Sequence, residues 1–355
     1  MVQAEWRGEH EKMSNSSADD QGEASQFIKI GIPIVLGLNV CVFVVQIPLS
    51  LLNIGILCRT SLLHRNLKFI LFIQSVLFCT FALTLCVQFL IIAFYGIQQW
   101  ASFTPLLFTM IFVHTYIIYI GHILFVERTM ATFMANKYES VKNNWFSASW
   151  LIILTVYSFI IGLQQANNTN SLSTFTTIST FLSLVISFLE IFTFSMLSKF
   201  NEKLFNKKLK CSNSNGHNLT ERYQLTENIR TGHQLWPTFL LHFLIIGWTS
   251  IFIFLYHYII IYSLFLFFVQ FNYLFLSFYH LLIEYTIISR HPILRQNAVQ
   301  ILKKIFNKFS MKIPCNNRVN DNVKHPTIGR IDGRNLPEKH LMNETDQHFK
   351  ILKEL

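Results

Sequence analysis

Residues 69–126 contain no Asp, Glu, Lys or Arg, which makes a charge-free run of 58 residues. Two further charge-free runs cover residues 30–58 and 231–283. About 20 apolar residues are enough for one helix to cross the roughly 30 Å hydrocarbon core of a bilayer. Runs of this length and apolarity exceed what a soluble core needs, so they predict an integral membrane protein.

Helices are the expected spanning elements, because a helix satisfies all of its backbone hydrogen bonds within its own segment. The run 30–58 is long enough for one span, and each of the two longer runs is long enough for two. Two more apolar stretches lie between Glu139 and Lys199. The sequence therefore predicts an all-α fold, an integral membrane bundle of seven helices. The predicted spans are 30–57, 69–95, 102–126, 145–163, 175–197, 235–257 and 263–288.

The distribution of basic residues predicts the orientation, because loops rich in Lys and Arg stay in the cytoplasm. With the amino terminus outside, 26 of the 29 Lys and Arg fall in segments predicted to be inside. The other three are Arg7, Lys12 and Lys29, and the outer loops have none. The formal net charge of +10 is thus an expected consequence of topology and does not indicate a nucleic-acid partner.

The regions outside the seven-helix domain (29–289) have their own predicted roles. Residues 1–28 form a polar extracellular tail without an apolar signal sequence, so the first span is expected to act as an uncleaved signal anchor. Residues 290–312 predict a basic amphipathic helix on the inner leaflet. Residues 313–355 are predicted to be a disordered cytoplasmic tail. Asn15 and Asn167 are candidate N-glycosylation sites, and Cys315 is a palmitoylation candidate.

Catalysis is not expected, since the sequence has none of the familiar motifs for a zinc protease, a nucleophilic serine or a phosphate loop. His114 and His122 are eight positions apart, about 12 Å along a helix, which is too far for one metal ion. We therefore expect no metal, no cofactor and no enzyme activity. Glu190 and Glu284 are intramembrane acids and hence functional candidates, although each can also reach the inner interface from its predicted position.

Glu127 and Arg128 are the first charges after the 58-residue run. An acid that holds an arginine at the end of a membrane helix can act as a two-state element. The alternative is a positive-inside stop signal with an incidental acid. The stretch LTERYQLTENIRTGHQLWP (219–237) predicts a cytoplasmic helix that continues into the sixth span. In it Glu227 and Arg230 are spaced to meet at i,i+3.

Four stretches resemble motifs of the nematode serpentine chemoreceptors of the Sra superfamily. They are LLHRNLK (62–68), ERTMATFMANKYE (127–139), LTERYQLTENIR (219–230) and RHPILR (290–295). The Sre class fits best, because the segment AFYGIQQWASF (93–103) lacks the acidic, tyrosine-rich stretch of the Srab, Sra and Srb classes. The resemblance implies a G-protein-coupled receptor fold and a role for the motif residues in switching and G-protein coupling. These residues are Glu127, Arg128, Tyr138, Glu139, Arg222, Tyr223, Gln224, Glu227 and Asn228.

The sequence thus predicts a plasma-membrane receptor of a sensory neuron, in its cilia, that detects a small odorant or pheromone and activates a heterotrimeric G protein. Short outer loops favour a ligand pocket between helices. Membrane lipid is the other expected partner. The alternative is a seven-span ligand-gated channel or carrier of inverted topology. Candidate pocket residues are Tyr95, Trp100, Trp248, His257, Gln270, Asn272 and Tyr273.

Topology separates these two functions directly. We expect an epitope tag at residue 1 to be labelled by antibody on intact cells, because the basic residues hold the opposite side in the cytoplasm. A carboxyl-terminal tag is the internal control and should need permeabilisation. Labelling of the residue 1 tag only after permeabilisation would contradict the receptor topology.

Overall fold

The computed structural model describes residues 18–60, 63–96, 103–134, 145–167, 174–210, 219–258 and 262–309. All regular secondary structure in these ranges is α-helical. Seven long helices and one shorter helix confirm the predicted all-α fold. They are α2 (Ala18–Arg59), α3 (Arg65–Tyr95), α4 (Thr104–Phe133), α5 (Trp145–Asn167), α6 (Thr174–Lys210), α7 (Leu219–Tyr258), α8 (Tyr262–Arg290) and α9 (Pro292–Phe309).

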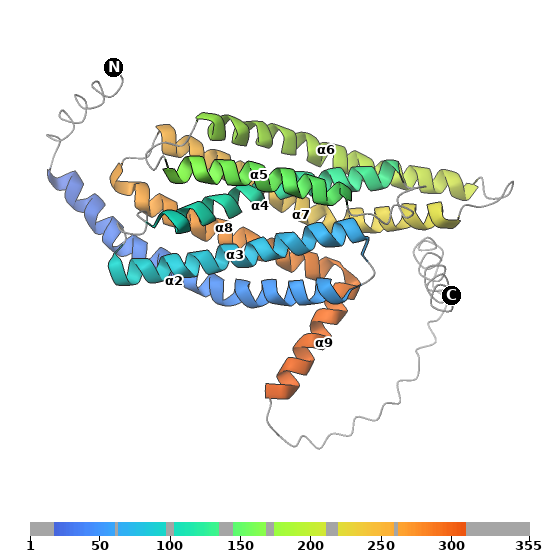
Figure 1. The fold of residues 1–355 in the computed structure, drawn as a ribbon, viewed down its shortest axis with the longest axis horizontal. Helices are drawn as coiled ribbons and strands as arrows, with labels where there is room; N and C mark the ends of the chain where they lie inside the picture. The colour runs from blue at the N-terminus through green and yellow to red at the C-terminus, as the bar shows by residue number, and fades with distance from the viewer. Residues whose placement is uncertain are drawn as a thin grey trace.

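The seven long helices run side by side along the long axis of the molecule (Figure 1). Helices α2 to α7 each contain a segment long and apolar enough to cross a membrane. Helix α8 has 29 residues, which is also enough for the roughly 30 Å hydrocarbon core. Helix α7 continues without a break from the motif LTERYQLTENIR into its apolar segment, as the helical spacing predicts.

Helix α4 occupies the centre of the bundle, where it packs against α3, α5, α6 and α7. In its most apolar window 56% of the residues are buried, against 28% for both α2 and α6. Helix α2 packs against α3 and α8 on another side. Side chains of α4 are therefore placed to contact most of the other helices.

The surface of the bundle is apolar, unlike that of a soluble protein, and its interior holds polar as well as apolar side chains. Large apolar side chains such as Val44, Ile152 and Phe192 are exposed, whereas polar side chains such as Gln46, Asn53 and Gln74 are fully buried. Lipid tails solvate apolar groups but offer no hydrogen bonds, so polar groups gain by facing the interior. This arrangement fits a bundle surrounded by hydrocarbon.

Local sequence sets where α3 begins and ends. At its start, the Nδ1 atom of His64 accepts a hydrogen bond from the backbone N–H of Asn66 at 3.4 Å. At its end, Gly96 has φ +89°, and its N–H donates to the carbonyl of Ile92 at 3.0 Å. A left-handed residue after the last helical turn favours glycine, so Gly96 fixes the end of α3 at Tyr95.

Helix α9 leaves the bundle at an angle after the end of α8 (Figure 1). Its first turns are attached, since Leu294 and Ala298 are buried and Asn297 Nδ2 donates to Thr60 Oγ1 at 3.4 Å. Further along, Val299 and Leu302 are exposed. The predicted amphipathic helix is confirmed as a helix of 18 residues.

Gly121 allows α4 and α7 to approach closely. A Cβ atom at this position would lie 3.0 Å from Cγ and 3.2 Å from Nδ1 of the His242 ring. His242 cannot retreat freely, because it is 3% exposed and its Nε2 is hydrogen-bonded to Gln74 Nε2 at 3.3 Å. The glycine therefore sets the spacing of these two helices.

We expect Gly121→Ala to lower the Tm of the detergent-solubilised protein, because overpacking a filled interior costs about 1–3 kcal/mol. Gly37→Ala is the matched control, since an added Cβ there meets no described atom within 4 Å. The control should leave Tm unchanged or slightly raised, because alanine favours helix. Equal effects of the two substitutions would contradict the close approach.

Candidate functional site

Glu127 and Arg128 form a buried ion pair near the end of α4. Nε and Nη2 of Arg128 donate hydrogen bonds to the two carboxylate oxygens of Glu127. Glu127 is 0% and Arg128 is 5% exposed. Burying two charges is costly, and bidentate geometry of this kind offsets part of the cost. The pair is thus held together by its surroundings as well as by its own contact.

The first of the four motifs reaches this pair from the start of α3. His64, in the stretch LLHRNLK, places Nδ1 at 3.9 Å from Oε1 of Glu127. The same histidine accepts the hydrogen bond that begins α3. The His64 side chain therefore contacts both the first turn of α3 and the Glu127 carboxylate of α4.

The third motif reaches α4 from α7. Asn228 Nδ2 donates to the backbone carbonyl of Ala131 at 2.9 Å, and Arg128 interacts electrostatically with Glu227. Glu227 and Arg230 lie 3.9 Å apart, which is the predicted i,i+3 contact. The Arg128 guanidinium is therefore placed between an acid of its own helix and an acid of α7.

The fourth motif joins the third at the corner between α8 and α9. His291 is 6% exposed. Burial, with a smaller contribution from the positive charge of Arg230, lowers the pKa of His291 to about 4. His291 is consequently neutral near pH 7, next to the basic residue of α7.

Helix α6 completes this end of the bundle, which we call the Arg128 end. Asn201 Nδ2 donates to Thr132 Oγ1 at 3.1 Å, between α6 and α4. A small cavity lies beside Arg128 among α4, α6 and α7. It is lined by Arg128, Thr132, Phe194, Leu197, Ser198, Asn201, Asn228 and Gly232.

Five of the residues predicted to act in switching or coupling have no described side chain. Tyr138 and Glu139 lie in the segment 135–144, between α4 and α5. The backbone of Arg222, Tyr223 and Gln224 belongs to α7, but their side chains are not among those described. The predicted role of these five residues stays a prediction.

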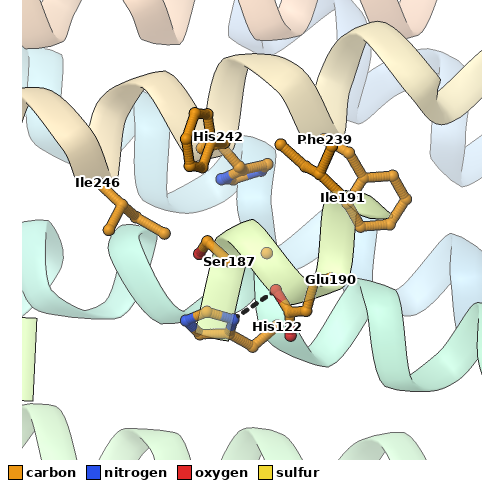
Figure 2. Close-up of a pocket in the computed structure, with 9 residues that line it drawn as sticks. His122, Ser187, Glu190, Ile191, Phe239, His242 and Ile246 are labelled. Carbon is orange, nitrogen blue, oxygen red and sulfur yellow. Dashed lines mark hydrogen bonds and ion pairs between the residues drawn. The ribbon is translucent and has the colours of Figure 1, made fainter. Parts of the chain in front are cut away.

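A second polar cluster links α4 to α6 in the interior of the bundle (Figure 2). The His122 ring contacts Glu190 Oε2 through Nδ1 and Ser183 Oγ through Nε2, both at 2.7 Å. His122 lies six residues before Arg128, about 9 Å along the helix. The side chains of His122 and Glu190 are only 17% and 13% exposed, so Glu190 is paired inside the bundle.

A small cavity adjoins this cluster, and Figure 2 shows His122, Glu190 and Ser187 on one side and His242 on the other. It has room for about one water molecule. Nδ1 of His242 has no hydrogen-bond partner among the described residues. Apolar side chains, among them Phe239, Phe243 and Ile246, complete the lining.

Sequence reasoning missed the partners of both clusters. The eight-residue spacing of His114 and His122 argued only against a shared metal ion. Because Glu190 could also reach the inner interface from its predicted position, a partner inside the bundle was not predicted for it. The available signal was a histidine and an acid in two predicted spans, 102–126 and 175–197, that contain no other charged residue. That signal could not show that α4 and α6 are neighbours.

The predicted ligand-pocket residues lie toward the other end of the bundle. Trp248 Nε1 donates to Asn272 Oδ1 at 2.9 Å, and the Trp248 ring stacks on Phe275 at 4.0 Å. Gln270 is 1% exposed and its Nε2 has no partner among the described residues. Tyr273 packs edge-on against Phe81 at 6.5 Å.

The structure separates the remaining pocket candidates from this group or does not describe them. Tyr95 is 68% exposed at the end of α3. Trp100 lies outside the described residues, and the side chain of His257 is not described. Among the candidate modification sites, Asn167 is the last residue of α5, while Asn15 and Cys315 lie outside the described ranges.

The fold is that of a multi-pass helical membrane protein. The family model described as Sre G protein-coupled chemoreceptor matches residues 26–354. The chain therefore belongs to the Sre family of G protein-coupled chemoreceptors, as the four motifs indicated, and it is a receptor and not an enzyme. A search of the curated proteins finds no match.

The His122–Glu190 pair gives a prediction about stability. We expect Glu190→Gln to lower the free energy of unfolding by about 1.5–3 kcal/mol, because it weakens a hydrogen bond to a carboxylate inside the bundle. Thermal and denaturant unfolding in detergent would measure this.

The chain supplies a matched control with the same two residue types. His233 and Glu202 lie 3.3 Å apart, with side chains 66% and 47% exposed. Glu202→Gln should change the free energy of unfolding by less than about 1 kcal/mol, since exposed pairs contribute little. If Glu190→Gln lowers the free energy of unfolding no more than Glu202→Gln does, the His122–Glu190 pair does not stabilise the bundle.

Proposed function

We propose that this Sre-family receptor detects a small odorant or pheromone-like molecule and activates a heterotrimeric G protein in response. The observation that carries the proposal is the buried Glu127–Arg128 pair beside a cavity formed by α4, α6 and α7. Family membership supports the general activity. The ligand class and the role of individual residues are the proposed part.

In the proposed resting state, three contacts keep the Arg128 end closed. Arg128 is held by Glu127, Asn228 of α7 is bonded to the α4 backbone, and Asn201 of α6 is bonded to Thr132. Movement of α7 away from α4 would break the Asn228 contact and open the cavity. The opened cavity would then admit a segment of the G protein.

Helix α7 has a feature suited to such a movement. Pro237 lies inside the helix, where it cannot donate a backbone hydrogen bond to the preceding turn. Helices bend most readily at such positions. We infer that the part of α7 on the Arg128 side of Pro237 moves as a lever, with Thr238, hydrogen-bonded to Thr286 of α8 at 3.3 Å, next to the hinge.

The proposed ligand site lies at the opposite end, near Trp248, Gln270, Asn272 and Tyr273. The Trp248–Asn272 hydrogen bond joins α7 to α8 there, so a ligand that displaces either side chain would act on α7 directly. We propose the plasma membrane of sensory cilia as the location, with the amino terminus outside and the Arg128 end in the cytoplasm. This orientation rests on the basic residues.

The proposal is tested by screening volatile organic compounds and pheromone-like small molecules on cells that express the receptor with a G-protein reporter. With an active compound in hand, we expect Arg128→Ala to reduce the evoked response at least roughly tenfold, the effect of losing about 1.4 kcal/mol of coupling. Surface labelling must show equal amounts of receptor.

Arg59→Ala is the control for this substitution. Arg59 is an exposed basic residue at the end of α2, so its removal changes the charge at the bundle end without touching the pair. Its response should match that of the unaltered receptor. An unchanged response in Arg128→Ala would refute the proposed switch.

A further inference from the structure

Glu284 of α8 is a third buried acid, and it belongs to none of the clusters described above. Its side chain is 0% exposed. Ser50 of α2 donates a hydrogen bond to Oε2 at 2.6 Å, while Oε1 accepts none from the described residues. The ion pairs of the described chain do not include Glu284.

Other side-chain oxygens gather around this carboxylate from α2 and α3. The Ser75 hydroxyl interacts with Glu284 and also accepts a hydrogen bond from Asn53 Nδ2 at 2.9 Å. Ser50, Asn53 and Ser75 are each 0% exposed. The carbonyl oxygen of Asn53, Oδ1, has no partner among the described residues.

The cluster therefore contains two buried acceptor atoms without described donors, Glu284 Oε1 and Asn53 Oδ1. Unsatisfied acceptors and unpaired charges are costly at membrane depth. A proton on Glu284 Oε1 would remove the charge, and its O–H would bring a single donor into the cluster. A cation held by several oxygens can satisfy both atoms and the charge at once.

The neighbouring histidine does not supply that positive charge by direct contact. His280 lies one turn before Glu284, and its ring stacks on Phe78 with centroids 4.6 Å apart. Neither of its ring nitrogens has a partner in the described part of the chain. Since none of the ion pairs among the described residues includes Glu284, its charge is neutralised either by a bound proton or by a bound cation.

The chemistry of the cluster selects the kind of ion. All of its donors are carboxylate, amide or hydroxyl oxygens, which suit hard cations. A single carboxylate balances one positive charge. The close contacts of Ser50 Oγ with Glu284 Oε2 at 2.6 Å and of Asn53 Nδ2 with Ser75 Oγ at 2.9 Å leave room only for a small ion. We propose that Ser50, Asn53, Ser75 and Glu284 form a binding site for one Na⁺ ion that ties α2, α3 and α8 together.

The proposal does not depend on the proposed ligand or on G-protein coupling, so its test uses stability alone. The full-length receptor in detergent is unfolded thermally in NaCl, KCl or N-methylglucamine chloride at one ionic strength. A ligand that binds only the folded state raises Tm with saturation. We expect a saturable rise in Tm with Na⁺ that equal concentrations of K⁺ and N-methylglucamine do not reproduce.

Glu284→Gln should abolish the Na⁺-dependent rise in Tm. Ser50→Ala should raise the half-saturating Na⁺ concentration roughly tenfold or more, because it removes a hydroxyl that binds the ion or orients the Glu284 carboxylate. Glu190→Gln removes a different buried acid and should retain the rise. If Glu284→Gln does not fold, competition of unlabelled Na⁺ against ²²Na⁺ on the unaltered receptor and on Ser50→Ala decides the question.

Two outcomes would overturn the proposal. Equal Tm of the unaltered receptor in all three salts would mean that Glu284 is neutralised by a proton. A Na⁺-dependent rise that persists in Glu284→Gln would mean that the ion acts elsewhere.

Discussion

Hydrocarbon cannot hydrogen-bond to protein, and this constraint accounts for most of the arrangement of the bundle. Every polar side chain within the membrane must find a hydrogen-bond partner in the protein or be left unsatisfied at high cost. The buried polar groups therefore form contacts between helices, such as Asn53 with Ser75 and Gln74 with His242. These contacts fix which helix faces lie inside, while apolar side chains such as Phe192 face outward.

The central position of α4 determines where those contacts gather. Side chains of α4 reach His64 at the start of α3 and Glu190 of α6, and the backbone carbonyl of Ala131 accepts a hydrogen bond from Asn228 of α7. The Glu127–Arg128 pair and His122, about 9 Å apart along one helix, thus join α4 to the helices around it. A displacement of α7 at one end changes the environment of Arg128 through Asn228 and Glu227, which makes the Arg128 end suited to a two-state response.

Much of this could be read from the sequence. The charge-free runs predicted seven helices, and the motifs predicted the family, because span length and loop charge are properties of contiguous residues. The i,i+3 contact of Glu227 with Arg230 and the amphipathic helix α9 were predictable for the same reason. Partners on different helices were not, and His122 with Glu190 is the clearest example, since 68 residues separate them.

By itself, the sequence determined that the chain crosses a membrane as helices, where each helix lies along the chain, and which family it belongs to. The tertiary structure decided which buried polar groups meet: His64 with Glu127, His122 with Glu190, and Ser50 with Glu284. The physical reason is that helix–helix contacts depend on the rotation and neighbours of each helix in the bundle. The rotation and the neighbours of a helix are set by packing among all seven helices together, so they cannot be read from any one segment of the sequence.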